Sequence, residues 1–290
     1  MDDLTDNNIT DQMMRKERNL LRVYVENAGY KLIKIISTGV YLAIDANGKK
    51  YIVKNYREIG LDGFPTYDNP EKCIQVLNSI KKHENIQNLH RVFELNDSWS
   101  KVLITDYVQG ITLARYLYKN PLKMGEMFTI LGQIIEAVSY LHSKGVVHRD
   151  LTPANIIWDG KKATIIDFGA ATFIGARDGG NVLMTIVIDY MQRDWLRPPE
   201  LHDDSLGSYT QFDTYYIGVL ALEMITGILF FEKAGRDKTS CIKDVINERK
   251  IDVSLAKFIM KSTADDPRKR YKNIKALSRD FDKIRKRNGY

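Results

Sequence analysis

The first third of the chain alternates apolar and polar residues in short runs, which predicts β-strands. The runs KLIKII, VYLAI and KKYIVKNY, between residues 31 and 56, are rich in β-branched and aromatic residues, and the DANG segment at 45–48 is typical of a hairpin turn. We therefore predict three antiparallel strands. Two further strand-like runs, LHRVFEL and KVLITDYV, continue the pattern to Val108.

Helical spacing replaces this alternation in the rest of the chain. Residues 69–82 carry Ile74, Leu77 and Ile80 at amphipathic spacing, and after Gly110 the runs MFTILGQIIEAVSYLHSKG and TYYIGVLALEMITG predict longer helices. The apolar run around the second of these is interrupted by Glu223 and short for a bilayer span, so we predict a buried core helix and no transmembrane segment.

The predicted elements fall into two lobes of an α+β protein. We expect an N-terminal extension with a flanking helix at 1–29, a small antiparallel β-rich lobe with one helix at 30–108, and a larger, mainly helical lobe at 109–290. No internal repeat interrupts this order. The boundary between the lobes is expected near residues 108–110.

Composition narrows the class of protein only slightly. The net charge of +6 is concentrated between residues 268 and 287, where a solvated basic helix face is the expected explanation, and we predict no nucleic-acid partner. Cys73 and Cys241 lack the spacing of a disulfide framework or a zinc site. With no apolar secretory signal in the N-terminal sequence, a cytoplasmic location is expected.

Two segments carry the residue types that phosphoryl transfer requires, VVHRDLTPANIIW and ATIIDFGAAT. Asp150 offers a carboxylate that can accept a proton from an attacking hydroxyl. Asn155 and Asp167 offer hard oxygen ligands for Mg²⁺, and Gly169 allows a sharp turn after the second ligand. The alternative is that the polar residues of these loops are only structural.

The two segments together resemble the catalytic and magnesium loops of the eukaryotic-type protein kinase family, whose bilobal fold matches the predicted layout. The resemblance implies ATP with Mg²⁺ as cofactors, with Mn²⁺ as an alternative ion. It implies that Arg149 contacts a phosphate on the activation segment and that Lys54, at the end of Ile52-Val53-Lys54, binds the α- and β-phosphates of ATP.

The same resemblance implies the rest of the nucleotide site. A turn before the second strand would cover the phosphates, backbone groups at the lobe junction would bind the adenine edge, and apolar side chains would enclose the base. The turn residues are Ser37, Thr38 and Gly39, and the backbone groups are those of Asp106 and Val108. The apolar side chains are Val40, Ile52 and Ile157.

Several positions depart from the family pattern. Only Gly39 remains of three loop glycines, and Thr152 replaces the lysine common in serine/threonine kinases. The glutamate expected on the helix after Lys54 falls on Cys73 or Ile74, so Glu71 is the nearest acidic candidate. A weaker or different hold on ATP is therefore expected.

Later motifs extend the resemblance through most of the chain. Pro198-Pro199-Glu200 resembles the end of the activation segment, Asp213 with Gly218 the start of a central helix, and Asp266-Pro267 with Arg270 a late arginine motif. We expect Glu200 and Arg270 to form a buried ion pair. Candidate phosphate acceptors in a mobile activation segment are Thr172, Thr185 and Tyr190.

Three functions fit these observations. The chain is expected to be a protein kinase that phosphorylates Ser or Thr on a protein substrate, with itself as a candidate substrate. The alternatives are a nucleotide-binding pseudokinase scaffold, favoured by the lost glycines, and a phosphotransferase for non-protein hydroxyls. Nothing in the sequence specifies the oligomeric state.

Overall fold

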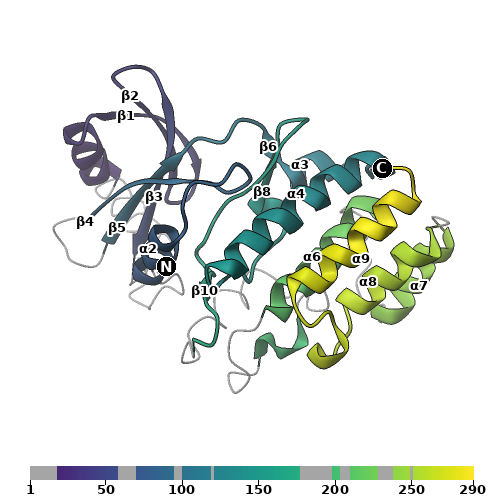
Figure 1. The fold of residues 1–290 in the computed structure, drawn as a ribbon. Coiled ribbons are helices and arrows are strands. Elements are labelled where there is room, and N and C mark those ends of the chain that lie inside the picture. The colour runs from purple at the N-terminus through teal and green to yellow at the C-terminus, as the bar shows by residue number, and fades with distance from the viewer. Residues whose placement is uncertain are drawn as a thin grey trace, which may run out of the picture. The chain divides into compact units, whose positions relative to one another are not determined.

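The computed structural model describes residues 18–57, 70–94, 100–118, 121–176, 198–202, 210–227, 238–248 and 251–290. The chain divides into two compact units (Figure 1). The first contains residues 1–78 and 87–107, and the second contains residues 79–86 and 108–290.

The first unit is built on a five-stranded antiparallel sheet. Its strands are β1 (Tyr30–Ser37), β2 (Val40–Asp45), β3 (Lys50–Arg57), β4 (Leu89–Glu94) and β5 (Ser100–Asp106), in the spatial order β1-β2-β3-β5-β4. The turn at 45–48 is closed by a hydrogen bond from Gly48 N–H to Asp45 O, 3.0 Å. The predicted strands are confirmed, and helix α2 (Pro70–Ser79) occupies most of the helical segment predicted after β3.

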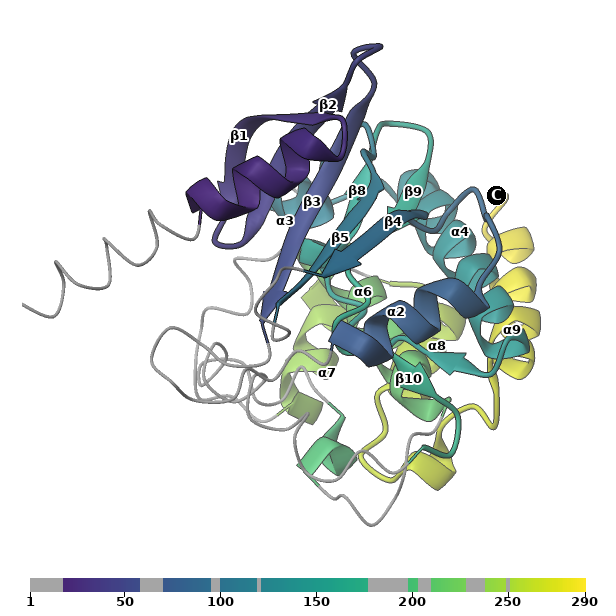
Figure 2. The same ribbon diagram turned by 90° about the vertical axis from the view of Figure 1, so that its left-hand side faces the viewer.

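The helix formed by residues 18–27 covers one face of this sheet (Figure 2). Leu21 and Val25 are completely buried in one cluster with Ala43 of β2 and Val53 of β3. Because successive side chains on a strand point to opposite faces, Lys54 lies on the other face of β3. The helix therefore belongs to the core of the unit and packs on the face opposite to that of Lys54.

Helices dominate the second unit. They are α3 (Leu113–Leu117), α4 (Met124–Ser143), α6 (Gln211–Thr226), α7 (Lys238–Glu248), α8 (Val253–Ser262) and α9 (Ile274–Arg287). Helix α4 contacts both α6 and α9, and α6 also contacts α8 (Figure 1). Almost every residue of α6 is buried, which confirms the predicted core helix. In the described part of the chain, no helix has the length and apolar character needed to cross a membrane.

Short strands and 3-10 turns in the second unit were not predicted. The strands β6 (Ile111–Thr112), β8 (Ile156–Trp158) and β9 (Ala163–Ile165) form one sheet, and β7 (Val146–Val147) pairs with β10 (Thr172–Phe173). The 3-10 turns are η1 (Pro153–Asn155), η3 (Pro199–His202) and η6 (Pro267–Lys269). Runs of two or three residues are too short to show a period of two, so their pattern could not reveal them.

Candidate active site

The loop after β7 is held by a buried carboxylate from α6. Arg149 adopts a left-handed conformation with φ 68°. Asp213, fully buried in the first turn of α6, accepts hydrogen bonds from the backbone N–H groups of His148 (3.0 Å) and Arg149 (2.9 Å). Its Oδ2 also lies 2.8 Å from His142 Nε2. These contacts stabilise a backbone conformation that costs roughly 1 to 3 kcal/mol by itself.

The protonation states of this cluster follow from its burial and hydrogen bonds. Burial alone raises the pKa of Asp213, but the hydrogen bond and charge of His142, with the contacts of His148, hold that pKa below its ordinary value. Burial lowers the pKa of His148, against the opposing charges of Asp213 and Asp167. Asp213 is therefore an ionised acceptor and His148 a neutral ring, packed 4.9 Å from the Phe168 ring.

Asp150 and Asn155 are joined directly. The Asn155 side-chain amide donates to Asp150 Oδ2 (2.6 Å) and to the Asp150 carbonyl (3.1 Å), and both side chains are half-buried. Because the amide nitrogen makes both contacts, the amide oxygen of Asn155 is turned away from Asp150. These contacts do not use the oxygen, and an amide oxygen is a hard ligand of the kind that Mg²⁺ and Ca²⁺ accept.

Asp167 lies on the segment adjoining Asn155. Ile166 N–H donates to the Asn155 carbonyl (2.9 Å), which fixes the residue before Asp167 beside the segment of Asn155. Asp167 has φ 61°, and its Oδ1 accepts from Gly169 N–H (3.1 Å). The structure therefore brings the segments of the three predicted residues Asp150, Asn155 and Asp167 together within one unit.

This donor set fits Mg²⁺. One carboxylate and one amide oxygen are hard ligands, and Mg²⁺ is commonly held by one or two carboxylates with substrate phosphates and water. Among the described residues there is no cluster of three or more His, Cys, Asp or Glu side chains that would form an all-protein metal cage. Asn155 and Asp167 would supply two protein ligands to the ion, which leaves its other coordination positions for nucleotide phosphates and water.

Lys54 lies in the middle of β3 in the first unit. It pairs with Val40 of β2 and with Leu103 of β5, and its side chain is half-buried. Its Nζ lies 4.3 Å from the centre of the Tyr56 ring. Ile52, two residues earlier, projects to the same face of the sheet and is also half-buried.

The predicted phosphate-covering turn is a tight hairpin. Ser37 pairs with Val40, so only Thr38 and Gly39 connect β1 to β2. Gly39 has φ 71°, and its carbonyl accepts from Asn55 N–H (2.8 Å). Ser37 and Thr38 are exposed. The single glycine in the sequence predicted a shortened loop, and a turn of two residues is consistent with it.

The predicted adenine-binding segment follows β5. Asp106 N–H donates to the Asn88 carbonyl (3.0 Å), and the Asp106 carbonyl accepts from Gln87 Nε2 (3.1 Å). A carbonyl oxygen has a second lone pair, so it can accept another hydrogen bond. Val108, in the second unit, is half-buried, and so is Ile157 in the middle of β8.

Glu71, the acidic candidate on α2, contacts a lysine that sequence reasoning missed. Its Oε1 lies 3.8 Å from Nζ of Lys101 on β5, and its side chain is 63% exposed. Lys101 is buried and also pairs with Glu94 of β4. The position of Lys101 at the start of the apolar run KVLITDYV could have indicated this contact, since a buried ammonium requires acidic partners.

The late motifs behave as expected where the structure describes them. Arg270 donates to both carboxylate oxygens of Glu200, with Nη2 to Oε2 at 2.7 Å, and both side chains are buried. The predicted ion pair is confirmed. Thr172, a candidate phosphate acceptor, is fully buried in β10, so the structure does not support it. Thr185 and Tyr190, with most of the predicted activation segment, lie outside the described residues.

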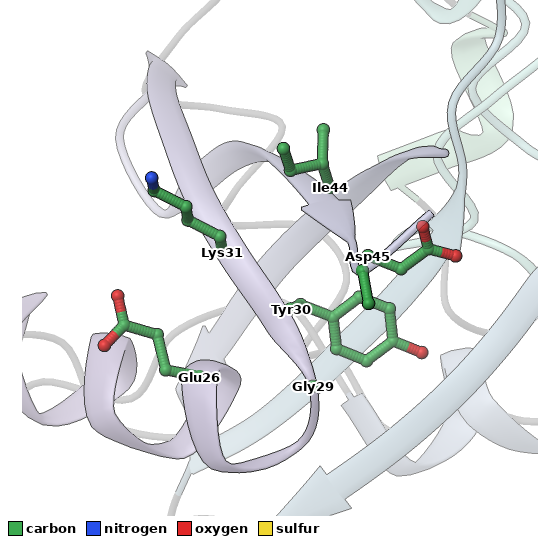
Figure 3. Close-up of a pocket in the computed structure, with 7 residues that line it drawn as sticks. Glu26, Gly29, Tyr30, Lys31, Ile44 and Asp45 are labelled. Atoms are coloured by element: carbon green, nitrogen blue, oxygen red, sulfur yellow. The ribbon is translucent and has the colours of Figure 1, made fainter. Parts of the chain in front are cut away.

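The first unit also has a hollow that none of these residues lines. It is lined by Glu26 of the 18–27 helix, by Gly29 after that helix, and by Tyr30, Lys31, Ile44 and Asp45 of the β1–β2 hairpin (Figure 3). The Asp45 carboxylate accepts from the backbone N–H groups of the turn that follows it. The hollow contains none of the predicted site residues.

Comparison with known proteins decides the family. A family model described as the protein kinase domain matches residues 37–281, most of the chain. The chain belongs to the protein kinase family. Kinases of this family use ATP with divalent metal ions and phosphorylate proteins, and the matched region includes the segments of Asp150, Asn155 and Asp167 described above.

Individual kinases are 26 to 30% identical to this chain over the aligned regions. Serine/threonine-protein kinase D of Synechocystis is 26% identical over 86% of the chain and 50% of its own length. PrkC of Bacillus subtilis is 28% identical over 69% of the chain and 31% of its length, and CTD kinase subunit alpha of Schizosaccharomyces pombe is 30% identical over 69% and 32%. The chain thus spans half or less of these kinases.

Proposed function

We propose that this chain is an active ATP- and Mg²⁺-dependent protein kinase that phosphorylates Ser or Thr. The observation that carries the proposal is the hydrogen-bonded pair of Asp150 and Asn155, joined through the Asn155 backbone to the segment of Asp167. A scaffold that only binds nucleotide has no need of a carboxylate held in this way. Relatives whose names describe serine/threonine kinases support the choice of acceptor.

In the proposed reaction, Asp150 acts as the proton acceptor. The oxygen of the Ser or Thr hydroxyl forms a bond to the γ-phosphorus of ATP while the bond from that phosphorus to the β–γ bridging oxygen breaks. The hydroxyl proton passes to the Asp150 carboxylate, and ADP leaves with the bridging oxygen. Asn155 donates one hydrogen bond to the Asp150 carboxylate and one to the Asp150 carbonyl, and together they limit the positions of the carboxylate for this transfer.

Mg²⁺ would be held by the side-chain oxygens of Asn155 and Asp167. When bound, the ion supplies positive charge that offsets the negative charge of the phosphates. The left-handed backbone at Asp167, with its carboxylate fixed by Gly169 N–H, limits the positions that this ligand can take. Mn²⁺ prefers similar oxygen ligands and is an expected substitute.

Lys54 would bind the α- and β-phosphates through its ammonium group. The tight turn at Ser37, Thr38 and Gly39 would offer few backbone N–H groups to the phosphates, so a weaker affinity for ATP than in a long glycine-rich loop is expected. The remaining proposed nucleotide contacts are backbone groups of Asp106 and Val108 and the side chains of Val40, Ile52 and Ile157.

The substrate class and location complete the proposal. A protein substrate, with the chain itself as one candidate, is favoured by the Glu200–Arg270 pair, since Glu200 belongs to a motif that resembles the end of the activation segment of protein kinases. A cytoplasmic location suits the buried thiol of Cys73, which is not part of a disulfide.

The proposal is tested by incubating the purified protein with Mg²⁺, labelled ATP and a generic basic protein. We expect labelled protein, and no label after Asp150→Asn, Asp167→Ala or chelation of the metal. Asp159→Asn is the matched control, because Asp159 is an exposed aspartate whose carboxylate only accepts from the Lys161 and Lys162 N–H groups. Its activity should match the wild type.

The outcome also separates the alternatives. Phosphoserine or phosphothreonine in the product supports the proposal, whereas ATP binding without labelling of any acceptor would identify a scaffold. Label found only on a small-molecule hydroxyl would identify a different phosphotransferase.

A further inference from the structure

Near the position where the kinase family carries an acidic residue on the helix after Lys54, this chain has Cys73 and Ile74. Of the two residues that fall near this position, Cys73 is 1% exposed, whereas Ile74 is only half-buried. The Cys73 sulfur lies 3.8 Å from the Tyr56 hydroxyl. Helix α2 therefore contacts β3 through a cysteine and a tyrosine at this point.

Tyr56 also contacts the phosphate-binding lysine. It follows Lys54 by two positions on β3, so the two side chains lie on the same face of the sheet. Lys54 Nζ is 4.3 Å from the ring centre, within the range of a cation–π contact, and Tyr56 is only 3% exposed. A ring buried to this degree has few positions open to it, and it limits where the ammonium can lie.

A second contact fixes α2 over the same part of the sheet. Lys101 is opposite Tyr56 in the β3–β5 ladder, and its Nζ lies 3.8 Å from Glu71 in the first turn of α2. Its side chain is only 9% exposed and also pairs with Glu94. Since a buried ammonium needs its acidic partners, this cluster resists movement of α2 away from Tyr56.

We propose that Tyr56 is a positioning residue that links Lys54 to helix α2. Its ring holds the Lys54 ammonium, and its hydroxyl group meets the helix at Cys73. This inference rests on the proposed function in one respect, which is the binding of ATP phosphates by Lys54. It assigns to a tyrosine part of the positioning that an acidic side chain on this helix provides in other kinases.

The first test compares three variants by their kinetics with ATP. Tyr56→Leu removes the ring, Tyr56→Phe keeps it, and Tyr51→Leu is the matched control. Tyr51 is also buried on β3 and has Lys49 Nζ 4.9 Å from its ring, but it belongs to the cluster under the 18–27 helix, on the opposite face. All assays are run well below the unfolding temperature of the least stable variant.

We expect Tyr56→Leu to reduce kcat/KM for ATP by about threefold to thirtyfold, the range that a cation–π contact supports. Tyr56→Phe keeps the ring but loses the contact with Cys73, so its kcat/KM should lie between those of the wild type and Tyr56→Leu. Tyr51→Leu should stay within about twofold of the wild type. Equal losses for Tyr56→Leu and Tyr51→Leu would overturn the proposal, because they would reflect general destabilisation. A loss for Tyr56→Phe as large as that for Tyr56→Leu would also overturn it.

A second measurement does not depend on kinase activity. An amine-acylating reagent modifies only the neutral amine, so a ring that stabilises the ammonium form slows modification of Lys54. Mass spectrometry without ATP should show faster modification of Lys54 in Tyr56→Leu, with the exposed Lys50 unchanged. An unchanged rate at Lys54 would refute the positioning role, even in a protein that fails the kinase assay. Failure of the kinase assay alone would instead refute the proposed function.

Discussion

The buried pair of Glu200 and Arg270 gives a sharp test of how the second unit is stabilised. None of the Arg270 side chain and 4% of the Glu200 side chain are exposed. Besides its two contacts with Glu200, the Arg270 guanidinium donates to the carbonyls of Ala264 (2.7 Å), Asp265 (3.2 Å) and Gln211 (3.3 Å). Removing Arg270 therefore leaves a buried carboxylate and several carbonyls without their donor.

The expected cost of Arg270→Met follows from this arrangement. Removing one partner of a buried ion pair costs about 3 to 5 kcal/mol, because the remaining charge stays in a poorly solvated site. For a unit of this size, each kcal/mol lowers the melting temperature by about 2 to 4 °C, so a fall of roughly 6 to 20 °C is expected. Thermal unfolding followed by circular dichroism measures it.

Arg268→Met is the matched control for this prediction. Arg268 lies in the same segment and contacts Asp266 at 2.9 Å, but its side chain is 90% exposed. Exposed pairs contribute about 0 to 1 kcal/mol, so its melting temperature should change by at most about 4 °C. If the two variants melt at the same temperature, the reasoning from burial is wrong.

Two further predictions concern the packing and the protonation of the second unit. Gly218→Ala should destabilise it by about 1 to 3 kcal/mol in denaturant unfolding, because the added Cβ would lie 2.5 Å from Ser262 Cβ. For the control Gly132→Ala, the nearest atom to the added Cβ is 3.6 Å away, so this variant should be neutral or stabilising. His148 has its pKa lowered by burial, so its contribution to stability is present above about pH 6.5 and is lost as pH falls through the lowered pKa. His148→Phe should therefore flatten the pH dependence of the unfolding free energy below about pH 6.5, and an unchanged slope would contradict this assignment.

The sequence predicted the parts of the site that depend on short, contiguous segments. Asp150 and Asn155 lie five residues apart in one loop, and the structure joins them by a direct hydrogen bond. The strands of the first unit were predictable because each is long enough to show alternation. The Glu200–Arg270 pair was predictable only by resemblance, since the two residues are 70 positions apart and neither has a local pattern that reveals the other.

Contacts set by three-dimensional register could not be predicted. Lys101 is buried because the β3–β5 ladder places it opposite Tyr56, under the first turn of α2. The contact of Asp213 with His142 joins α6 to the end of α4, and nothing in either helical pattern indicates it. Such contacts depend on how elements pack, which the periodicity of one segment does not encode.

The helix at residues 18–27 changes where the folded domain should be considered to begin. The family match runs from residue 37 to residue 281, yet Leu21 and Val25 are wholly buried before it, and Ile284 is 4% exposed after it. A protein trimmed to the matched segment would lose most of β1 and present Ala43 and Val53 to water. A shortened form for crystallisation or ligand screening should therefore keep residues 18–290, because the exposed apolar surface would otherwise promote aggregation.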